Sequence, residues 1–227
     1  YRLEVKKLKN HEINIKGLNG LFCLSQKDCK YFERYYENVN YLPVFLEGTF
    51  ELKSNNKVEE FALYHGNLEV EENIKAVEFL HEVFRTLKWK LVIAGNSEGD
   101  HINRIIKNSS NIELEPSPSR ERMHSLIESA HLHCLPTFQN TGVKLKLISS
   151  LINGKTVLVN NRMISEEYLG EFCEFAEGVE DWQSSINKLM ETSIQEGEIR
   201  KRRESLLKTY DNLKNAKFLL ESLAEVQ

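Results

Sequence analysis

Short apolar runs alternate along this chain with longer amphipathic runs, and this alternation constrains the fold more than any other feature. Strands are predicted at residues 61–64, 89–94, 112–114, 131–135 and 156–159. Helices are predicted at residues 70–87, 101–107, 119–129, 142–153, 164–169 and 179–191. Strands separated by helices indicate βαβ units and a parallel sheet. We therefore expect an α/β fold, a Rossmann-like open parallel sheet with helices on both faces.

The flanking segments are less regular, so the chain divides into four expected parts. Residues 1–47 hold two short apolar runs and a helix that Ser25 caps, and residues 48–60 have the composition of a linker. Residues 61–193 carry the regular alternation and form the main domain. Residues 194–227 predict two polar helices with a break near residues 210–212.

Composition excludes several classes of protein. The net charge of −4 leaves no basic surface in bulk, so we expect no nucleic-acid partner. No stretch approaches the roughly 18 apolar residues of a membrane span, and residues 1–16 lack the apolar core of a secretory signal. The four cysteines form no C-x-x-C pair, which favours a reducing compartment and no zinc site. We expect a cytoplasmic protein, with peripheral attachment to the inner membrane face left open.

Ligands of open parallel sheets bind beyond the carboxyl ends of the strands, which directs attention to the turns there. Residues 66–67, 95–96 and 137–142 are such turns, and each contains a glycine. The last opens a predicted helix at Gly142 that carries Lys144 and Lys146 in its first turn. Lysines oppose the helix dipole at that position, and a bound anion removes the conflict. The alternative is that the lysines face solvent and the glycines only shape turns.

Other motifs point less clearly to chemistry. His65 ends the first strand of the main domain and either contacts a ligand or packs. His131 and His133 share one face of a strand, where core histidines are commoner than metal ligands. The basic run at residues 200–203 has acidic neighbours, which predicts a solvated helix face. Phosphate-loop, dinucleotide and nucleophile-elbow motifs do not occur, and no metal or cofactor is expected.

Four segments, taken in order, carry a family pattern: FALYHGNLEVEENIKAVEFL, WKLVIAGN, NIELEPSPSRERMHSLIESAHLHCLPTF and TGVKLKLISSLINGKTVLVN. Together they resemble the carboxyl-terminal domain of the retaining, family 4 or group 1, glycosyltransferases of the GT-B fold. The residues before Gly48 resemble the end of that family's amino-terminal domain, with Ser25 and Asp28 in its turn. The helices after Ile194 resemble its tail. An unrelated Rossmann-like domain remains the alternative.

The chain departs from the family at several positions. The family's E-x7-E carboxylates, which contact the transferred sugar and the donor ribose, align with Thr141 and Ser149. Its Arg and Lys after the first glycine turn fall near Asn67 and Glu72. Acidic groups in that turn are expected to repel phosphate. A third-turn glycine is replaced at about Pro116.

The resemblance implies a glycosyltransferase fragment, the donor half that binds a nucleoside diphosphate sugar for transfer to a glycan or lipid-linked acceptor in polysaccharide biosynthesis. Its catalytic acid or base lies outside this chain, which is expected to be incomplete and inactive without the amino-terminal domain. The expected donor-binding residues are His65, Gly66, Asn67, Gly95, Asn96, Thr137, Thr141, Gly142, Lys144, Lys146 and Ser149. The alternative is a diverged GT-B-like binding or scaffold module without transferase activity.

Overall fold

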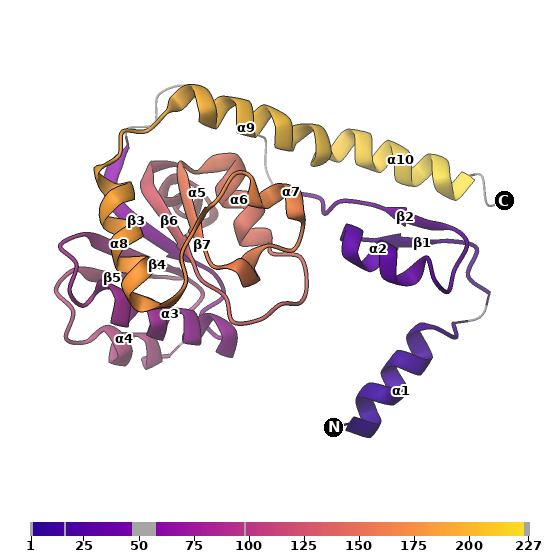
Figure 1. Cartoon of the computed structure of the whole chain (residues 1–227), viewed down its shortest axis with the longest axis horizontal. Coiled ribbons are helices and arrows are strands. Elements are labelled where there is room, and N and C mark those ends of the chain that lie inside the picture. Colours follow the sequence, from indigo (N-terminus) through magenta and orange to yellow (C-terminus); the bar gives the residue numbers. More distant parts are fainter. Residues whose placement is uncertain (1, 16, 47–57, 98, 225–227) are drawn as a thin grey trace. The chain divides into compact units, whose positions relative to one another are not determined.

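The computed structural model describes residues 2–15, 17–46, 58–97 and 99–224 (Figure 1). The chain divides into two compact units. The smaller unit combines Tyr1–Glu47 with Lys208–Gln227, and the larger unit is Gly48–Leu207. Most of the predicted linker lies outside the described residues. Which domain of a longer protein the smaller unit belongs to stays a prediction.

A six-stranded parallel sheet forms the centre of the larger unit, in the order β5-β4-β3-β6-β7-β8. Its strands are β3 (Glu59–His65), β4 (Lys90–Gly95), β5 (Ile112–Pro116), β6 (Ala130–Leu135), β7 (Thr156–Val159) and β8 (Glu174–Phe175). The chain runs outward from β3 to β5 and then crosses back to β6, which pairs with β3 on its other side. The strand order therefore reverses between β3 and β6. The predicted α/β fold with a parallel sheet is confirmed.

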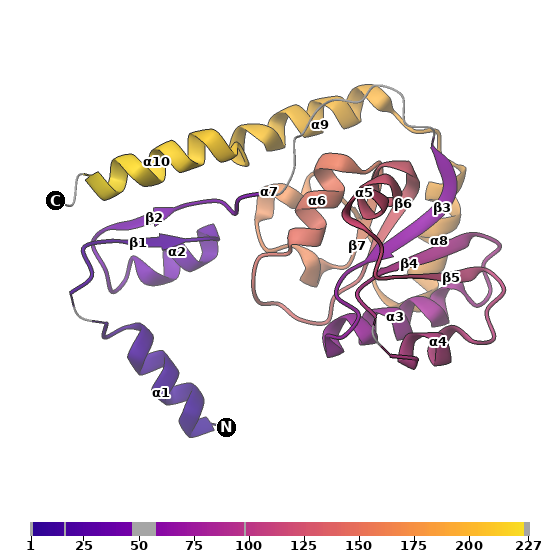
Figure 2. The ribbon, with the colours of Figure 1, turned by 180° about the vertical axis from the view of Figure 1, so that it is seen from behind.

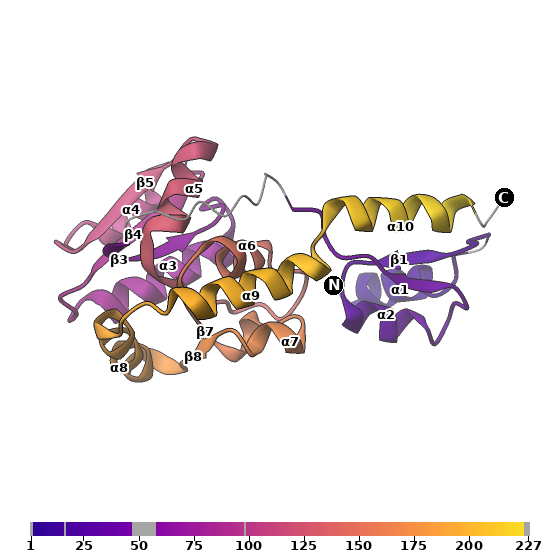
Figure 3. The same ribbon diagram turned by 90° about the horizontal axis from the view of Figure 1, so that it is seen from above.

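Helices cover both faces of this sheet (Figures 2 and 3). They are α3 (Glu71–Phe84), α4 (His101–Ile106), α5 (Arg120–Ser129), α6 (Leu145–Asn153), the 3-10 turn η1 (Asn161–Met163), α7 (Glu167–Gly170), α8 (Gly178–Glu191) and α9 (Glu196–Thr209). On one face α3 packs beside α4 and α8, and on the other α5 packs beside α6.

The strands of the sheet place apolar side chains on both of its faces, and helices cover these side chains. Phe61 and Leu63 of β3 pack with Leu126 and Ile127 of α5 in one apolar cluster. Tyr64 points to the other face, where its hydroxyl reaches α3. Successive side chains of a strand alternate between faces, so a strand that is covered twice must be apolar throughout. The continuous apolar runs of the sequence therefore correspond to the central strands.

The smaller unit contains α1 (Arg2–Glu12), β1 (Leu21–Cys23), α2 (Gln26–Phe32), β2 (Val39–Tyr41) and α10 (Asn212–Ala224). β1 and β2 form a parallel pair. Ser25 caps α2 as predicted, because its hydroxyl accepts a hydrogen bond from the Asp28 amide at 3.0 Å. The side-chain amide of Asn212 makes two hydrogen bonds with the Leu46 backbone, of 3.0 and 2.7 Å. This pairing joins segments far apart in the sequence.

Three local predictions are wrong. The helix expected to open at Gly142 begins at Leu145, with Lys144 as its N-cap residue. The helix expected at residues 164–169 is present only at its end, as α7 from Glu167, and the 3-10 turn η1 precedes the segment. The basic run is not a solvated face throughout, since Arg202 and Arg203 are only 9% and 8% exposed. Arg202 donates hydrogen bonds to the carbonyls of Gly154 and Lys155 at 2.7 and 2.8 Å.

Candidate functional site

The turns after β3 and β4 meet at the carboxyl edge of the sheet and are joined through their backbones. The Gly66 amide donates to the Ala94 carbonyl at 3.1 Å, and the Leu68 amide donates to the Asn96 carbonyl at 3.0 Å. The chain at Gly95 runs so close to Gly66 that a Cβ atom there would overlap the Gly66 carbonyl. Glycine at position 95 is therefore required by backbone packing.

Lys146, the second residue of α6, reaches back to the turn after β3. Its Nζ donates to the Tyr64 hydroxyl at 3.1 Å and to Asn73 Oδ1 at 2.5 Å, and lies 4.8 Å from the centre of the Tyr64 ring. A Cβ atom on Gly66 would come within 3.0 Å of the same Nζ. Burial, assisted by the charge of Lys144 and opposed by Glu72, lowers the pKa of Lys146 to about 8. The amine thus lies directly beside the first turn.

Glu72, in the first turn of α3, holds the loop that follows β6. Its Oε1 accepts hydrogen bonds from the Thr137 hydroxyl at 2.5 Å and from the Phe138 amide at 2.6 Å. Partial burial raises the pKa of Glu72, but these two bonds, the nearby Gln139 amide and the charge of Lys144 bring it below its usual value. The carboxylate expected only to repel phosphate is instead a structural partner of the loop.

The remaining predicted residues of the loop and helix surround this contact. Gly142 has a φ of +74°, a left-handed conformation that suits glycine, and no atom would meet a Cβ there within 4 Å. Thr141 is exposed, and its hydroxyl accepts a hydrogen bond from the Gln139 side chain at 2.7 Å. Partial burial lowers the pKa of Lys144, and Glu72 opposes the shift. Ser149 is half-buried on α6.

His65 lies beneath the edge. It is 7% exposed, and its Nε2 is 2.9 Å from the Ser150 hydroxyl of α6. Burial, together with the nearby Lys146, lowers the pKa of His65 to about 3, so the imidazole is neutral at ordinary pH. Of the two readings of this residue, the geometry favours packing.

Asn67 and Asn96 act mainly through their backbones and short turns. The Asn67 side chain accepts from the Glu69 amide at 3.1 Å, and its carbonyl accepts from the Asn73 side chain at 2.8 Å. Asn73 therefore links Lys146 to the first turn, a role that no local sequence pattern signals. The predicted residues that converge are Gly66, Asn67, Thr137, Lys144 and Lys146.

The third turn, after β5, is built by a strained residue. Ser117 has a φ of 46°, its amide donates to the Gly95 carbonyl at 2.7 Å, and its hydroxyl accepts from the Ser97 amide at 3.3 Å. The left-handed position is therefore Ser117, one residue after Pro116. A side chain there costs about 1 kcal/mol relative to glycine.

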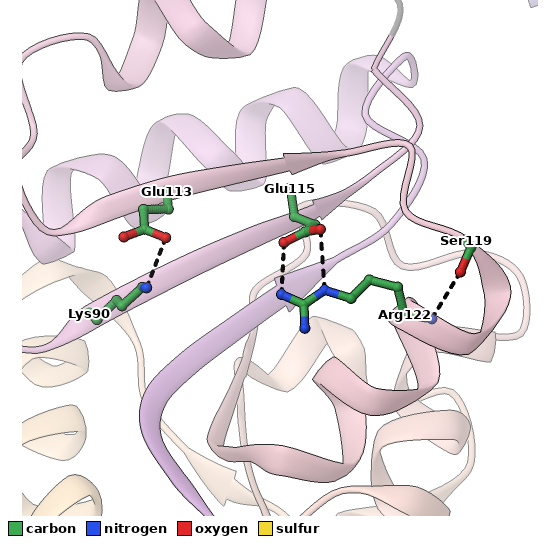
Figure 4. Close-up of polar contacts among 5 residues, drawn as sticks. All are labelled: Lys90, Glu113, Glu115, Ser119 and Arg122. Atoms are coloured by element: carbon green, nitrogen blue, oxygen red, sulfur yellow. Dashed lines mark hydrogen bonds and ion pairs between the residues drawn. The ribbon is translucent and has the colours of Figure 1, made fainter.

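A second charged cluster, on the outer strands, is satisfied internally (Figure 4). Arg122 of α5 makes two hydrogen bonds to the Glu115 carboxylate at 3.0 and 3.2 Å, and Lys90 pairs with Glu113 at 2.8 Å. Ser119 caps α5 through the Arg122 amide. Each charge in this cluster has a counter-charge, so the cluster leaves little attraction for a ligand. Its charged side chains instead protect the edge strand β5 from pairing with another chain.

In the described part of the chain, His131 and His133 do not form a metal site. His131 Nε2 lies 3.1 Å from the Leu189 carbonyl and His133 Nε2 lies 3.0 Å from the Ile127 carbonyl, so the two rings serve separate backbone partners. Within the described residues, no group of three or more His, Cys, Asp or Glu side chains is placed to hold a metal ion. In the same part of the chain, none of the helices has the length and apolar character that crossing a bilayer requires.

Comparison with solved structures places this fold among glycosyltransferases. A mutant of S. aureus TarM, solved with fondaparinux, alpha-GlcNAc-glycerol and UDP, is 17% identical with a TM-score of 0.73 over 95% of this chain and 46% of TarM. A Rickettsia africae glycosyltransferase is 12% identical, with a TM-score of 0.74 over 97% of this chain and 67% of that one. Anabaena HepE, solved with UDP and glucose, is 9% identical, with a TM-score of 0.72 over 99% and 68%.

These identities establish the fold alone, and the chain spans about half the length of TarM. A search of curated proteins found no match. The sequence family described as Glycosyl transferases group 1 matches residues 59–192, which is more than half of the chain and includes every strand of the larger unit. The resemblance noted from the sequence is therefore confirmed: this chain belongs to the group 1 glycosyltransferases and has the α/β architecture of a GT-B half.

Proposed function

We propose that the larger unit binds a nucleoside diphosphate sugar at the carboxyl edge of its sheet, and that the complete protein transfers that sugar to a glycan or lipid-linked acceptor. The observation that supports this most is the convergence of Lys144 and Lys146 on the turns after β3 and β6. Both cations lie at the amino end of α6, where backbone amides and the helix dipole also favour an anion.

The chemistry of transfer explains why such a site is useful. The departing nucleoside diphosphate gains negative charge as the bond to the sugar breaks, and preorganised cations and amides stabilise that charge. Gly142 leaves the loop after β6 open to a ligand, since no atom lies within 4 Å of the place that a Cβ would take there, whereas Gly66 and Gly95 allow the two turns and Lys146 to pack together. Thr141 and Ser149 are proposed to contact hydroxyl groups of the donor.

The remaining parts of the proposal rest on the family and on its relatives. TarM and HepE were solved with UDP, which makes a uridine donor the first one to test. We propose that an amino-terminal domain completes the cleft, that this chain alone is inactive, and that the protein works in cytoplasmic polysaccharide biosynthesis. No residue of this chain is assigned as the acid or base.

Calorimetric titration of the chain with UDP, GDP and their glucose conjugates tests the donor site. We expect one nucleotide to bind, and Lys144→Ala combined with Lys146→Ala to weaken it at least about tenfold, equivalent to ~1.4 kcal/mol. The control is Lys107→Ala combined with Lys188→Ala, which removes the same charge from exposed positions. Equal loss in both pairs, or no binding of any nucleotide, contradicts the proposal and favours a scaffold role.

A further inference from the structure

The loop after β6 already holds an anion, and that anion belongs to the protein. The Thr137 hydroxyl and the Phe138 amide both donate to Glu72 Oε1, at 2.5 and 2.6 Å. The Gln139 amide is the next donor along the loop, and it donates to the Thr137 hydroxyl oxygen at 3.4 Å. A hydroxyl and a backbone amide that converge on one negative group are donors of the kind that also bind phosphate.

The carboxylate comes from a different element, 65 residues before its partner Thr137. Other hydrogen bonds hold the loop in place. The Thr137 backbone amide donates to Asn160 Oδ1 at 3.1 Å, and the Asn160 side-chain amide donates to the Thr137 carbonyl at 2.7 Å. The loop conformation therefore does not depend on Glu72 alone. Its donors can be transferred from one anion to another without refolding the loop.

Glu72 also has other cations within reach. Lys144 lies close enough to lower the pKa of its carboxyl, on the side of α6. On α3 itself, Lys75 is three residues further along and pairs with Glu71 at 2.7 Å; this hydrogen bond, then the charge of Glu71, and then those of Glu72 and Glu78 raise its pKa. A carboxylate that leaves the loop can therefore turn toward Lys75 on the same helix.

We propose that Glu72 is an internal stand-in for a phosphate group, which occupies the donors of Thr137 and Phe138 until a nucleoside diphosphate displaces it. This inference rests on the proposed function, because the same edge must bind the donor. Glu72 then sets the affinity of the site: it keeps the loop ordered when the site is empty and competes with the diphosphate when the ligand arrives. The competition concerns the phosphates and not the base.

Titration of the full chain and of Glu72→Gln with UDP, GDP, inorganic pyrophosphate and uridine tests this. Glutamine keeps a hydrogen-bond acceptor for the loop and removes the charge, so the fold should survive. We expect Glu72→Gln to bind the preferred nucleoside diphosphate and pyrophosphate about tenfold more tightly, with no change for uridine. Glu71→Gln, which removes the same charge from the neighbouring exposed residue, should change either affinity by less than about threefold.

Hydrogen exchange provides a second readout that does not depend on affinity. In ligand-free Glu72→Ala, the amide of Phe138 should exchange faster than in the unaltered chain, and the nucleotide should restore its protection. If the unaltered chain binds nucleotide and Glu72→Gln binds it equally or less tightly, the stand-in role is wrong while the donor site stands. If neither protein binds any phosphate compound, both the inference and the proposed function fail.

Discussion

The two ends of α6 both carry positive charge, but the charges meet different surroundings. At the carboxyl end, Arg202 of α9 is 9% exposed and donates to the carbonyls of Gly154 and Lys155, the two residues that follow the last residue of the helix. At the amino end, Lys144 is the N-cap residue and Lys146 the second residue of the helix, where positive charge opposes the helix dipole. Burial lowers the pKa of Arg202 to about 10 and that of Lys146 to about 8, so the two ends differ in their partners: two backbone carbonyls accept from Arg202, whereas a hydroxyl and a side-chain amide oxygen accept from Lys146.

This difference separates a structural cation, Arg202, from the two lysines that are proposed to bind the donor. Arg202 stabilises the helix end whether or not a ligand is present. Lys146 is partly balanced by Tyr64, Asn73 and Glu72, yet its lowered pKa of about 8 shows that its environment still disfavours the charge. A fold tolerates such a group where a ligand of opposite charge is bound. The amino end of α6 is thus where an anion has the most to contribute.

The largest expected loss of stability follows from a change at the carboxyl end of α6. Arg202→Met keeps the apolar stem but removes the donors, leaving the Gly154 and Lys155 carbonyls without them. We expect the free energy of unfolding in urea to fall by about 3 kcal/mol. Arg200→Met, an exposed neighbour on α9, should change it by less than about 0.5 kcal/mol.

The matching change at the amino end of α6 is Lys146→Met, which tests whether the two ends of the helix differ in their contribution to stability. The Tyr64 hydroxyl still donates to Asn73 Oδ1 at 3.0 Å without the lysine, and an unfavourably placed charge is removed. Stability is therefore expected to stay within about 1 kcal/mol of the unaltered chain. A loss as large as that of Arg202→Met would make Lys146 a structural cation and remove the reason to place an anion beside it.

A smaller effect concerns pH. The pKa of Lys146 lies near 8, below its ordinary 10.5, so the folded chain loses this charge between about pH 7 and 9. Nearby Glu72 stays ionised, His65 stays neutral and the pKa of Tyr64 is raised, so none of them titrates in this window. The dissociation constant for nucleotide should rise several-fold from pH 7 to 9, and this dependence should disappear in Lys146→Ala.

In the ligand-free chain, the contribution of Lys146 to stability should rise with pH, whereas its contribution to nucleotide binding should fall. Between about pH 8 and 10.5 the unfolded Lys146 is protonated while the folded one is not, so this residue makes stability rise with pH. Urea unfolding of the unaltered chain and of Lys146→Ala at pH 7.5 and 9.5 isolates this contribution. An affinity that is independent of pH would mean that Lys146 does not contact the ligand in its charged form.

Sequence patterns predicted the sheet well because burial on two faces demands continuous apolar runs, as in Leu91–Ala94. They failed where charge and burial conflict. α1 has no apolar stripe strong enough to predict a helix, and the basic run that contains Arg202 has the composition of a solvated face. Its burial depends on carbonyls of a distant helix end, which no local pattern encodes.

The candidate site was predictable in the same limited sense. The edge, its glycine turns and the two lysines follow from strand order and helix position. The contact between Glu72 and Thr137 joins residues 65 positions apart, and the sequence suggested repulsion there instead. Asn73 and Asn160 were missed because a side-chain amide that links two segments through hydrogen bonds leaves no periodic signal.

Hydrogen exchange of the full chain with and without saturating UDP or GDP tests the central claim most directly. We predict that protection rises at residues 66–68, 95–97 and 137–149, the turns at the carboxyl edge, and stays unchanged at the amino ends of the same strands. Protection confined to the amino ends, or none at the carboxyl edge while calorimetry records binding, would contradict the location of the donor site.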